Sequence, residues 1–447
     1  MSWPTEPLGA ICEIVSGITK DSKKQGDDYR EVPYLRVANV QRLQLNLSEV
    51  KTIPAKESTI ASYRLEPGDI LLNEGGDRDK LGRGWIWQGQ ISECIHQNHV
   101  FRARIRDGKA IPKWIAYYAN TNEARAYFLA SGKQTTNLAS ISKKNLSALP
   151  VPLPPVDVQE TLVAEIDTQL SRLDKAVTTL QGIQAKLKQA RASILKAAVE
   201  GRLVETEAEL AIRQGRTHEL AAELLDTMDR QKNKKSATTS ETAAPQWDAP
   251  TSWEWTNIGH VSLKVKYGTS AKCQERGDGI PVIRMGNIQD GKIHMDKIKY
   301  LPKTHHEFPE QLLRKGEVLF NRTNSIDLVG KTAVFRGDSP HACASYIIRV
   351  LPADGISPEF LAITLNSPFG RAWARHEASQ QVGQANINSK KLMNFRFPLP
   401  PRLEQLRIKE EVDRRFSVLD QVEATVQTSL ARCGKLQQAI LKRAFGA

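Results

Sequence analysis

The strongest constraint on the fold is that four blocks of the amino-acid sequence occur twice, in the same order. Two pairs are 248 residues apart: VPYLRVANVQ (32–41) with IPVIRMGNIQ (280–289), and LEPGDILLN (65–73) with LRKGEVLFN (313–321). Two more are 246 residues apart: ISKKNLSALPVPLPP (141–155) with INSKKLMNFRFPLPP (387–401), and SILKAAVEG (193–201) with AILKRAFGA (439–447). Because the order is kept with two residues of drift, the sequence predicts a tandem duplication of one unit.

The first part of each repeat, residues 1–150 and 251–397, has the pattern of a mixed globule. Short β-rich runs such as VPYLRVANV and DILLN are separated by Gly, Pro and Asn turns, and IPKWIAYYAN and PEFLAITLN are typical of short helices. We therefore predict an α+β fold class, with two similar globules that each contain a mixed sheet and short helices.

The second part of each repeat, residues 151–204 and 398–447, has the pattern of one long helix that begins after paired prolines. Apolar residues with 4–3 spacing form a seam, interrupted by the polar residues Gln184, Arg191, Glu423 and Gln437. The seam residues are Ile166, Leu170, Leu173, Val177, Leu180, Leu187 and Ile194 in the first copy, and Val412, Phe416, Leu419, Val426, Leu430, Cys433 and Ile440 in the second. The two helices are predicted to bury these seams on each other as a coiled coil, a rod of about 60 Å at about 1.5 Å per residue.

The stretch between the two repeats has a different character. Residues 205–232 are predicted to contain a short amphipathic helix, THELAAELLDTMDRQ. Residues 233–250 are polar, rich in Ser, Thr and Ala, and without periodicity, which is typical of a flexible linker.

The charge distribution indicates a linear polyanion as partner. The net charge of the 447-residue chain is +13, and the two globules carry most of it: residues 1–150 have 21 Lys and Arg against 16 Asp and Glu, and residues 251–397 have 20 against 13. Two basic globules held apart by a rod fit double-stranded DNA touched at two places. A membrane is not expected, because no apolar run approaches the ~18 residues of a spanning helix. Five cysteines without a CxxC pair indicate a reducing cytoplasm.

Searches for catalytic or metal-binding patterns give no persuasive match. NSIDLVGKT (324–332) has Ser325 where a phosphate-binding loop needs glycine, and SGKQTTN (131–137) lacks a Ser or Thr directly after its lysine. The acids of NEGGDRDK (73–80) are interpreted as a polar loop, and His305 and His306 as loop residues. Strand alternation sends Cys94 and His96 to one face but His99 to the other, with His341 and Cys343 in the matching region, so we expect no metal. The chain is predicted to catalyse nothing.

These blocks together resemble the DNA-specificity subunit of type I restriction-modification enzymes. The resemblance rests on the WP and WEW openings, the LRVANVQ/IRMGNIQ and PGDILLN/KGEVLFN blocks, the PLPPxxxQ motif and the helix ends ILKAAVEGRLV and ILKRAFGA, and it covers essentially the whole chain. It implies two target-recognition domains that each read one half of a bipartite, asymmetric sequence. It also implies that the two helices pack as an antiparallel coiled coil, fix the gap between the halves and dock two methyltransferase (modification) subunits.

The resemblance further implies restriction/translocase subunits as partners and no cofactor bound by this chain, while its partners use S-adenosylmethionine, and ATP with Mg²⁺ for restriction. Two alternatives remain open at this point. The chain could serve a methyltransferase-only or fused type II-like system, or it could be a DNA-binding coiled-coil scaffold without sequence preference.

The candidate DNA-contacting residues follow the repeated strands or lie in polar, turn-prone segments that differ between the repeats. Arg suits the guanine edge, Asn and Gln suit adenine, and Lys suits phosphate. In the first repeat they are Arg78, Lys80, Arg83, Lys133, Gln134, Thr135, Asn137, Lys143 and Lys144. In the second they are Arg322, Asn324, Lys331, Gln381, Gln384, Asn386, Lys390 and Lys391. Arg36 with Asn39, and Arg284 with Asn287, are present in both copies and are therefore interpreted as structural or phosphate-positioning.

Overall fold

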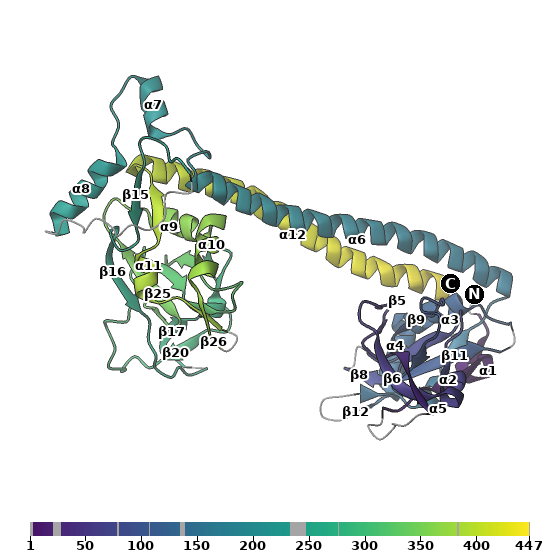
Figure 1. The fold of residues 1–447 in the computed structure, drawn as a ribbon. Coiled ribbons are helices and arrows are strands. Elements are labelled where there is room, and N and C mark those ends of the chain that lie inside the picture. The colour runs from purple at the N-terminus through teal and green to yellow at the C-terminus, as the bar shows by residue number, and fades with distance from the viewer. Residues whose placement is uncertain are drawn as a thin grey trace. The chain divides into compact units, whose positions relative to one another are not determined.

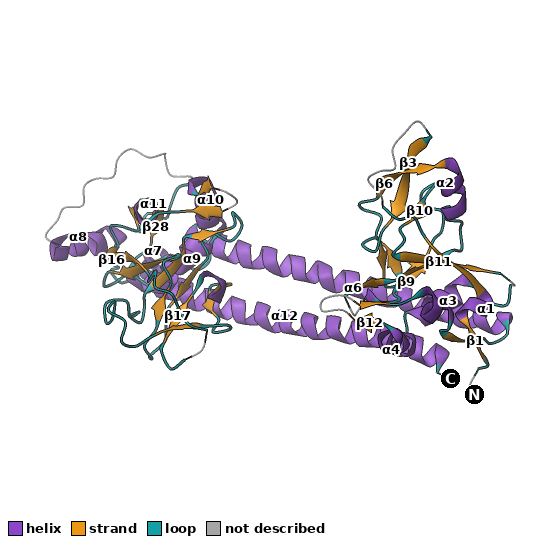
Figure 2. Ribbon diagram, turned by 90° about the horizontal axis from the view of Figure 1, so that it is seen from below, coloured by secondary structure: helices purple, strands orange, loops and turns teal. Residues whose placement is uncertain are grey.

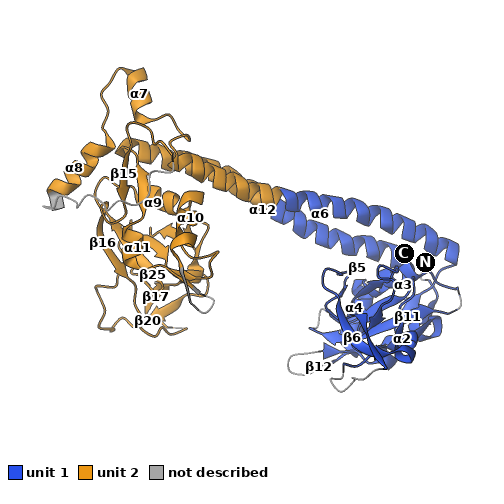
Figure 3. Ribbon diagram, viewed as in Figure 1, with its two compact units in different colours: residues 1–182, 426–447 blue, residues 183–425 orange. Residues whose placement is uncertain are grey.

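The chain forms two compact units, coloured separately in Figure 3. Unit 1 comprises residues 1–182 and 426–447, and unit 2 comprises residues 183–425. The computed structural model describes residues 3–20, 28–77, 80–106, 108–134, 139–232, 247–275, 277–381 and 384–446. Each unit contains a globule of strands and short helices together with segments of two long helices (Figure 1 and Figure 2).

The globule of unit 1 contains fourteen short strands and five helices in its described residues. The strands are β1 (Thr5–Pro7), β2 (Cys12–Ser16), β3 (Tyr29–Leu35), β4 (Val40–Gln41), β5 (Gln44–Leu45), β6 (Lys51–Lys56), β7 (Ile70–Asn73), β8 (Gly75–Gly76), β9 (Gly84–Ile86), β10 (Ile95–His96), β11 (Val100–Ile105), β12 (Lys133–Gln134), β13 (Ala139–Ser140) and β14 (Pro150–Pro152). The helices are α1 (Leu8–Ile11), α2 (Glu57–Tyr63), α3 (Pro112–Ala119), α4 (Asn122–Ser131) and α5 (Lys143–Ser147).

The globule of unit 2 has its strands in the same order along the chain, but no helix in its described residues corresponds to α1 or α2. Its strands are β15 (Glu254–Asn257), β16 (Ser262–Tyr267), β17 (Ile280–Ile283), β18 (Ile288–Gln289), β19 (Lys292–Ile293), β20 (Lys299–Leu301), β21 (Val318–Asn321), β22 (Thr323–Asn324), β23 (Thr332–Val334), β24 (Ala342–Cys343), β25 (Ile347–Pro352), β26 (Ser379–Gln381), β27 (Gln384–Asn386) and β28 (Arg396–Leu399). Its helices are α9 (Pro358–Asn366), α10 (Pro368–Glu377) and α11 (Ser389–Met393), with a 3₁₀ turn at Met285–Asn287.

Every sheet of unit 1 has a counterpart with the same strand order in unit 2. The central antiparallel sheets have the orders β2-β11-β7-β9 and β16-β25-β21-β23. The others are β10-β3-β6 with β24-β17-β20, β8-β13-β12 with β22-β27-β26, β1-β14 with β15-β28, and β4-β5 with β18-β19. The repeated apolar runs form the buried centre of the two four-stranded sheets, since all four residues of β7 and all four of β21 are buried.

The two long helices are α6 (Val156–Val199) and α12 (Arg402–Phe445). Both begin later than the predicted boundaries at 151 and 398, because the residues before the prolines are strands: β14 pairs with β1, and β28 pairs with β15. In unit 1, Ile166 and Leu170 near the start of α6 share a core with Ile440 near the end of α12. In unit 2, the end of α6 shares a core with Val412 near the start of α12. All the seam residues predicted in both helices are buried or half-buried.

The glutamine of the repeated PLPPxxxQ motif ties each long helix to its own globule. Gln159 Oε1 accepts a hydrogen bond from the backbone N–H of Ile111 at 3.0 Å, and Gln159 Nε2 donates to Lys109 O at 2.9 Å. In unit 2, Gln405 Oε1 accepts from the N–H of Ser357 at 2.8 Å. Both glutamines are fully buried. The motif therefore fixes the start of α6 against the start of α3, and the start of α12 against the start of α9.

Residues 205–232 form two helices, whereas one short helix was predicted. These are α7 (Glu207–Gln214) and α8 (Ala221–Lys232). The Thr206 side chain and Glu209 form a capping box at the start of α7, and Gly215 ends it with a left-handed φ of +64°. Most of the predicted linker 233–250 lies outside the described residues. None of the helices in the described ranges is long and apolar enough to cross a membrane.

Candidate nucleic-acid interface

Two groups of predicted DNA-contacting residues, far apart in sequence, meet in one small sheet in each unit. In unit 2, β22 follows the repeated strand β21 and pairs with β27, which in turn pairs with β26. This brings Asn324 next to Ala385 and Thr323 next to Asn386. In unit 1, β8 pairs with β13, and β13 pairs with β12, which contains Lys133 and Gln134. The structure therefore joins the segment after the repeated strand to the polar segment that precedes α5 or α11.

Arg322 lies at the centre of the interface in unit 2. Its Nη2 donates to Asn386 Oδ1 at 2.8 Å, and its Nε donates to Ile387 O at 3.3 Å. The guanidinium carbon lies 4.7 Å from the centroid of the Tyr267 ring, a cation–π contact. Because these contacts fix the side chain from three directions, Arg322 presents a pre-oriented guanidinium, the group that pairs with the O6/N7 edge of guanine.

Two exposed tyrosines that sequence reasoning missed flank Arg322. Tyr267 is 36% exposed, and its hydroxyl hydrogen-bonds the side chain and the backbone N–H of Ser389 at the start of α11. Tyr346 is 48% exposed, and its carbonyl accepts a hydrogen bond from the Arg322 N–H at 3.0 Å. Exposed aromatic rings beside a fixed cation suit contact with bases and sugars.

The same positions of unit 1 carry different chemistry. Glu74 replaces Arg322 and His99 replaces Tyr346, as the equivalent backbone bonds from Glu74 N to His99 O and from Ile141 N to Glu74 O demonstrate. His99 Nδ1 lies 2.6 Å from Glu74 Oε2. Sequence reasoning interpreted Glu74 as part of a polar loop and His99 as a strand residue. The signal that could have found Glu74 is its position directly after Asn73, as Arg322 directly follows Asn321.

The remaining predicted residues of unit 1 divide into three groups. Lys133, Lys143 and Lys144 are exposed, as a phosphate-contacting lysine must be. Lys80 is paired with Asp77, and Arg83 is half-buried beside the backbone of β7. Arg78, Thr135 and Asn137 lie outside the described residues, and for Gln134 only the backbone is described.

In unit 2 two of the predicted DNA-contacting cations, Lys391 and Lys331, have other surroundings than the small sheet. Lys391 Nζ donates to Glu377 O at 2.6 Å, and Lys331 lines a cavity of about 360 Å³ between the globule and the long helices. Lys390 and Asn386 are exposed, and Asn324 Oδ1 accepts from the N–H of Ser325 at 2.9 Å. For Gln381 and Gln384 the structure describes the backbone only.

The repeated Arg–Asn pairs were predicted to be structural or phosphate-positioning, and their asparagines have structural contacts. Asn39 Oδ1 accepts from the N–H of Arg36 at 2.9 Å, and Asn287 Oδ1 accepts from the N–H of Arg284 at 2.9 Å. Each asparagine amide also donates to two backbone carbonyls: to Asn46 and Glu49 in unit 1, and to His294 and Asp296 in unit 2. Both asparagines are buried, so they brace the turn between the repeated strands.

Substitution Asn287→Ala is expected to lower the free energy of unfolding by about 2–4 kcal/mol, because three hydrogen bonds are lost and buried backbone groups are left unpaired. Urea denaturation measures the change. Gln289→Ala is the matched control, since Gln289 makes one exposed hydrogen bond, to Gly286 O, and should cost under about 0.5 kcal/mol. Equal effects of the two substitutions would contradict a bracing role for Asn287.

The stretch 324–332 is not a phosphate-binding loop. The N–H groups of Leu328, Val329 and Gly330 donate to Ser325 O, Ser325 O and Asn321 O respectively. The Arg371 guanidinium donates hydrogen bonds to the backbone carbonyls of Asp327 and Val329. Because these amides are already engaged within the turn, they cannot cradle an anion.

The predicted strand residues Cys94 and His96 are buried core residues. Burial raises the pKa of the Cys94 thiol to about 12, so it stays protonated, which disfavours metal binding. His96 Nδ1 lies 2.7 Å from Val100 O.

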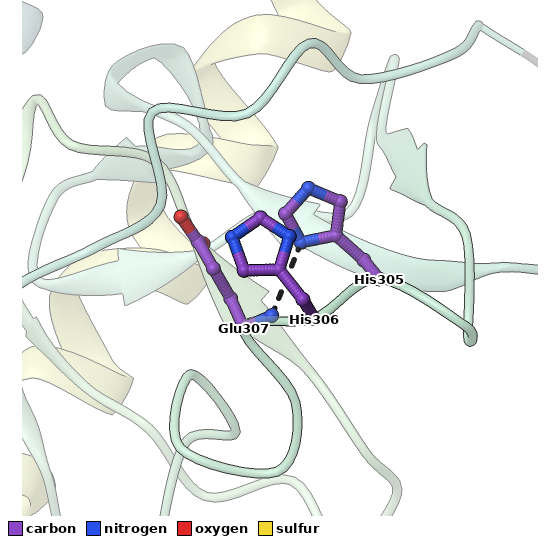
Figure 4. Close-up of side chains that lie close together, drawn as sticks. All are labelled: His305, His306 and Glu307. Atoms are coloured by element: carbon purple, nitrogen blue, oxygen red, sulfur yellow. Dashed lines mark hydrogen bonds between the residues drawn. The ribbon is translucent and has the colours of Figure 1, made fainter.

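A separate group, His305, His306 and Glu307, gathers in one loop of unit 2 (Figure 4), where His305 Nδ1 accepts from the Glu307 N–H at 3.3 Å. Three consecutive residues, with one ring nitrogen already engaged, fall short of the four ligands of a structural zinc site.

Burial of His96 predicts a pH dependence of stability. Burial is the largest cause that lowers the pKa of His96 from 6.5 to about 4 in the folded protein. The unfolded chain therefore binds more protons between pH 6.5 and 4, and stability falls as the pH falls through this window. We expect a loss of about 1 kcal/mol between pH 7 and 5.5, measured by urea denaturation. His96→Asn should reduce this slope, which the carboxyl group of Glu93 does not produce because its pKa in the folded protein is about 2. An unchanged slope would contradict the assignment.

The chain belongs to the family described as type I restriction modification DNA specificity domain, whose model matches residues 2–189 and 250–430. It is similar to the StySPI specificity subunit of Salmonella potsdam and to the EcoKI specificity subunit of Escherichia coli K12, with 25% identity to each. Both alignments cover 99% of this chain and 88% of the relative. Since these relatives are specificity subunits of type I restriction enzymes, the chain is a non-catalytic specificity subunit.

Solved structures share the fold. A chain from a structural study of complex assembly and conformational transition of the type I R-M system superposes with a TM-score of 0.66 at 17% identity, covering 99% of this chain and 97% of that chain. The HsdS subunit from Thermoanaerobacter tengcongensis gives a TM-score of 0.50 at 17% identity, with 99% and 96% covered. The chain therefore shares its fold with these two solved structures.

Proposed function

We propose that each globule reads one half of a bipartite, asymmetric DNA sequence through its small three-stranded sheet. The observation that carries this proposal is the difference between equivalent positions on a matching framework: Arg322 and Tyr346 in unit 2 replace Glu74 and His99 in unit 1. Arginine and carboxylate side chains favour different bases, because one donates to guanine and the other accepts from cytosine. Two such surfaces in one chain read two different half-sites.

We also propose that the chain is a tandem duplication in which α6 and α12 form an antiparallel coiled coil. The repeated sequence blocks and the matching strand orders support the duplication. The start of α6 packs with the end of α12 in unit 1, and the end of α6 packs with the start of α12 in unit 2. Two predicted polar seam residues meet, since Arg191 donates to Glu423 at 2.9 Å, and also to Asp420 at 2.6 Å.

In this proposal the helices fix the gap between the half-sites and dock two methyltransferase subunits. A duplicated scaffold presents two equivalent surfaces, which suits two copies of one partner. Restriction subunits join this core. The partners supply S-adenosylmethionine-dependent adenine methylation and ATP- and Mg²⁺-dependent cleavage, while the chain itself selects the site on DNA in the cytoplasm.

Mapping methylated adenines in a genome that carries this chain and its partner subunits tests the proposal. The expected result is one motif with two specific halves and a constant gap. No consensus would favour a scaffold without sequence preference. Methyl transfer by the purified chain alone would favour a fused enzyme over a specificity subunit.

A further inference from the structure

Three cations surround a cavity in unit 2 that lies apart from the small sheet. Lys264 and Lys266 on β16, with Arg314, line a cavity of about 330 Å³. We propose that this cavity binds a phosphate group of the DNA backbone, next to the half-site that the second globule reads. The inference rests on the proposed function and extends it to a contact that carries no sequence information.

A buried ion pair builds the floor of the cavity. Arg349 and Glu317 form two hydrogen bonds, at 2.8 and 2.9 Å, and their side chains are 7% and 5% exposed. The Arg349 guanidinium also donates to Leu312 O at 2.7 Å and to Gln311 O at 3.2 Å. These bonds fix the segment that leads to Arg314 against the sheet, so the wall of the cavity is rigid.

Unit 1 has the same framework without the cations. Arg102, the counterpart of Arg349, donates to Ser62 O at 3.3 Å and to Arg64 O at 3.1 Å, which are the equivalents of Glu310 O and Leu312 O. Strand pairing aligns the remaining positions, because Val15 lies opposite Arg102 as Lys266 lies opposite Arg349. The counterparts of Lys264, Lys266 and Arg314 are thus Glu13, Val15 and Glu66. The fold does not require cations here.

The cluster has too little negative charge around it. Within the described part of the chain, Lys264 and Arg314 form no ion pair, and Lys266 has only Glu310, at 3.5 Å and 81% exposed. A hydrogen bond from Lys266 is the largest cause that lowers the pKa of Lys264, followed by the charge of Lys266, by burial and by the charge of Arg314. An anion between the three cations relieves this repulsion, and a phosphate is matched to two ammonium groups and a guanidinium.

The position of β16 favours the DNA backbone as the source of the phosphate. β16 is an edge strand of its sheet (Figure 1), and its last residue, Tyr267, contacts Arg322 of the small sheet. Lys264 lies three residues from Tyr267, about 10 Å at 3.3 Å per residue. Strand alternation places Lys264 and Lys266 on the face opposite to Tyr267. The cavity therefore lies on the other face of this edge strand from Arg322, so the phosphate that it suits flanks the half-site and is not one beside the bases that Arg322 contacts.

The test is the salt dependence of DNA binding by the complex of the chain with its methyltransferase subunits. The double variant Lys264→Gln, Lys266→Gln keeps the side-chain length and removes two charges. The slope of log affinity against log salt concentration is expected to become shallower by about 0.9, since one phosphate contact contributes about this amount, with the methylated sequence unchanged. Lys315→Gln is the matched control, because Lys315 is paired with Asp338 at 2.9 Å, and its slope should equal that of the wild type.

Duplexes with single methylphosphonate linkages identify the contact. One uncharged linkage should weaken wild-type binding while leaving binding by the double variant unaffected. An unchanged salt slope in a complex that keeps its sequence preference would overturn this site and leave the proposed function standing. Loss of methyltransferase assembly by the double variant would also overturn it, in favour of a protein contact. A wild-type complex without sequence preference would overturn the proposed function itself.

Discussion

Exchange of the first globule for that of another specificity subunit is expected to change one half of the methylated sequence and to leave the other half unchanged. The reading surface of unit 1, with Glu74 and His99, is built entirely from residues of its own globule. Each mismatched base pair costs about 1–3 kcal/mol, so three altered positions should lower affinity for the original sequence by on the order of 10²-fold or more. Methylome sequencing of cells that carry the chimera measures the new motif.

The structure specifies where to join such a chimera. β1 pairs with β14, so residues 1–152 must come from one donor rather than residues 1–150. The donor must also contact the C-terminal helix, because the rings of Trp114 and Tyr118 lie 4.1 and 5.4 Å from that of Phe445. The reciprocal exchange of residues 253–399 should change only the other half of the motif. A change in both halves after either exchange would refute independent reading.

Insertion of seven residues into each long helix is expected to lengthen the gap between the half-sites. Arg191 contacts Asp420 and Glu423, so residues whose numbers sum to about 612 lie opposite each other. Insertions after Gly182 and after Leu430 therefore keep the facing seams in register, since seven residues preserve the heptad. The added length is about 10 Å at 1.5 Å per residue, which corresponds to about three base pairs at 3.4 Å each.

Methylome sequencing also measures this result, and two controls accompany it. Gly182→Ala and Gly434→Ala fill open space without changing helix length, so the gap should stay the same. Insertion into one helix only breaks the pairing of the seams and should weaken assembly. If the variant with both insertions is folded and active but the gap between its half-sites is unchanged, the helices do not set the length of the gap.

The local patterns predicted much of the architecture. Apolar runs such as ILLN and VLFN became the buried centre of each sheet, because an apolar strand has a low free energy only when both faces are covered. The presence of Asn39 and Asn287 in both copies correctly indicated a structural role, since a buried amide that satisfies three backbone groups has no equivalent replacement. Helix boundaries were less accurate where strand pairing of β14 and β28 competed with helix formation.

The candidate interface was only half predictable. Arg322 and Asn386 were both singled out from sequence, yet their hydrogen bond joins residues 64 positions apart. Tyr267 was missed because it lies on a strand that looks structural, and Lys331 was included although it lines a cavity beside the long helices. The type of a side chain carries no information on which distant segment of the chain will lie next to that residue.

The sequence by itself predicted one unit used twice, and it determined that the two globules are basic and that a long amphipathic helix accompanies each of them. These properties follow from periodicity, composition and repetition, which are readable along the chain. Only the tertiary structure decided that β22, β26 and β27 form one surface, that Glu74 and His99 stand where Arg322 and Tyr346 stand, and that Lys264, Lys266 and Arg314 converge on one cavity. The physical reason is that long-range strand pairing and buried ion pairs set these juxtapositions, and neither leaves a periodic signal in the local sequence.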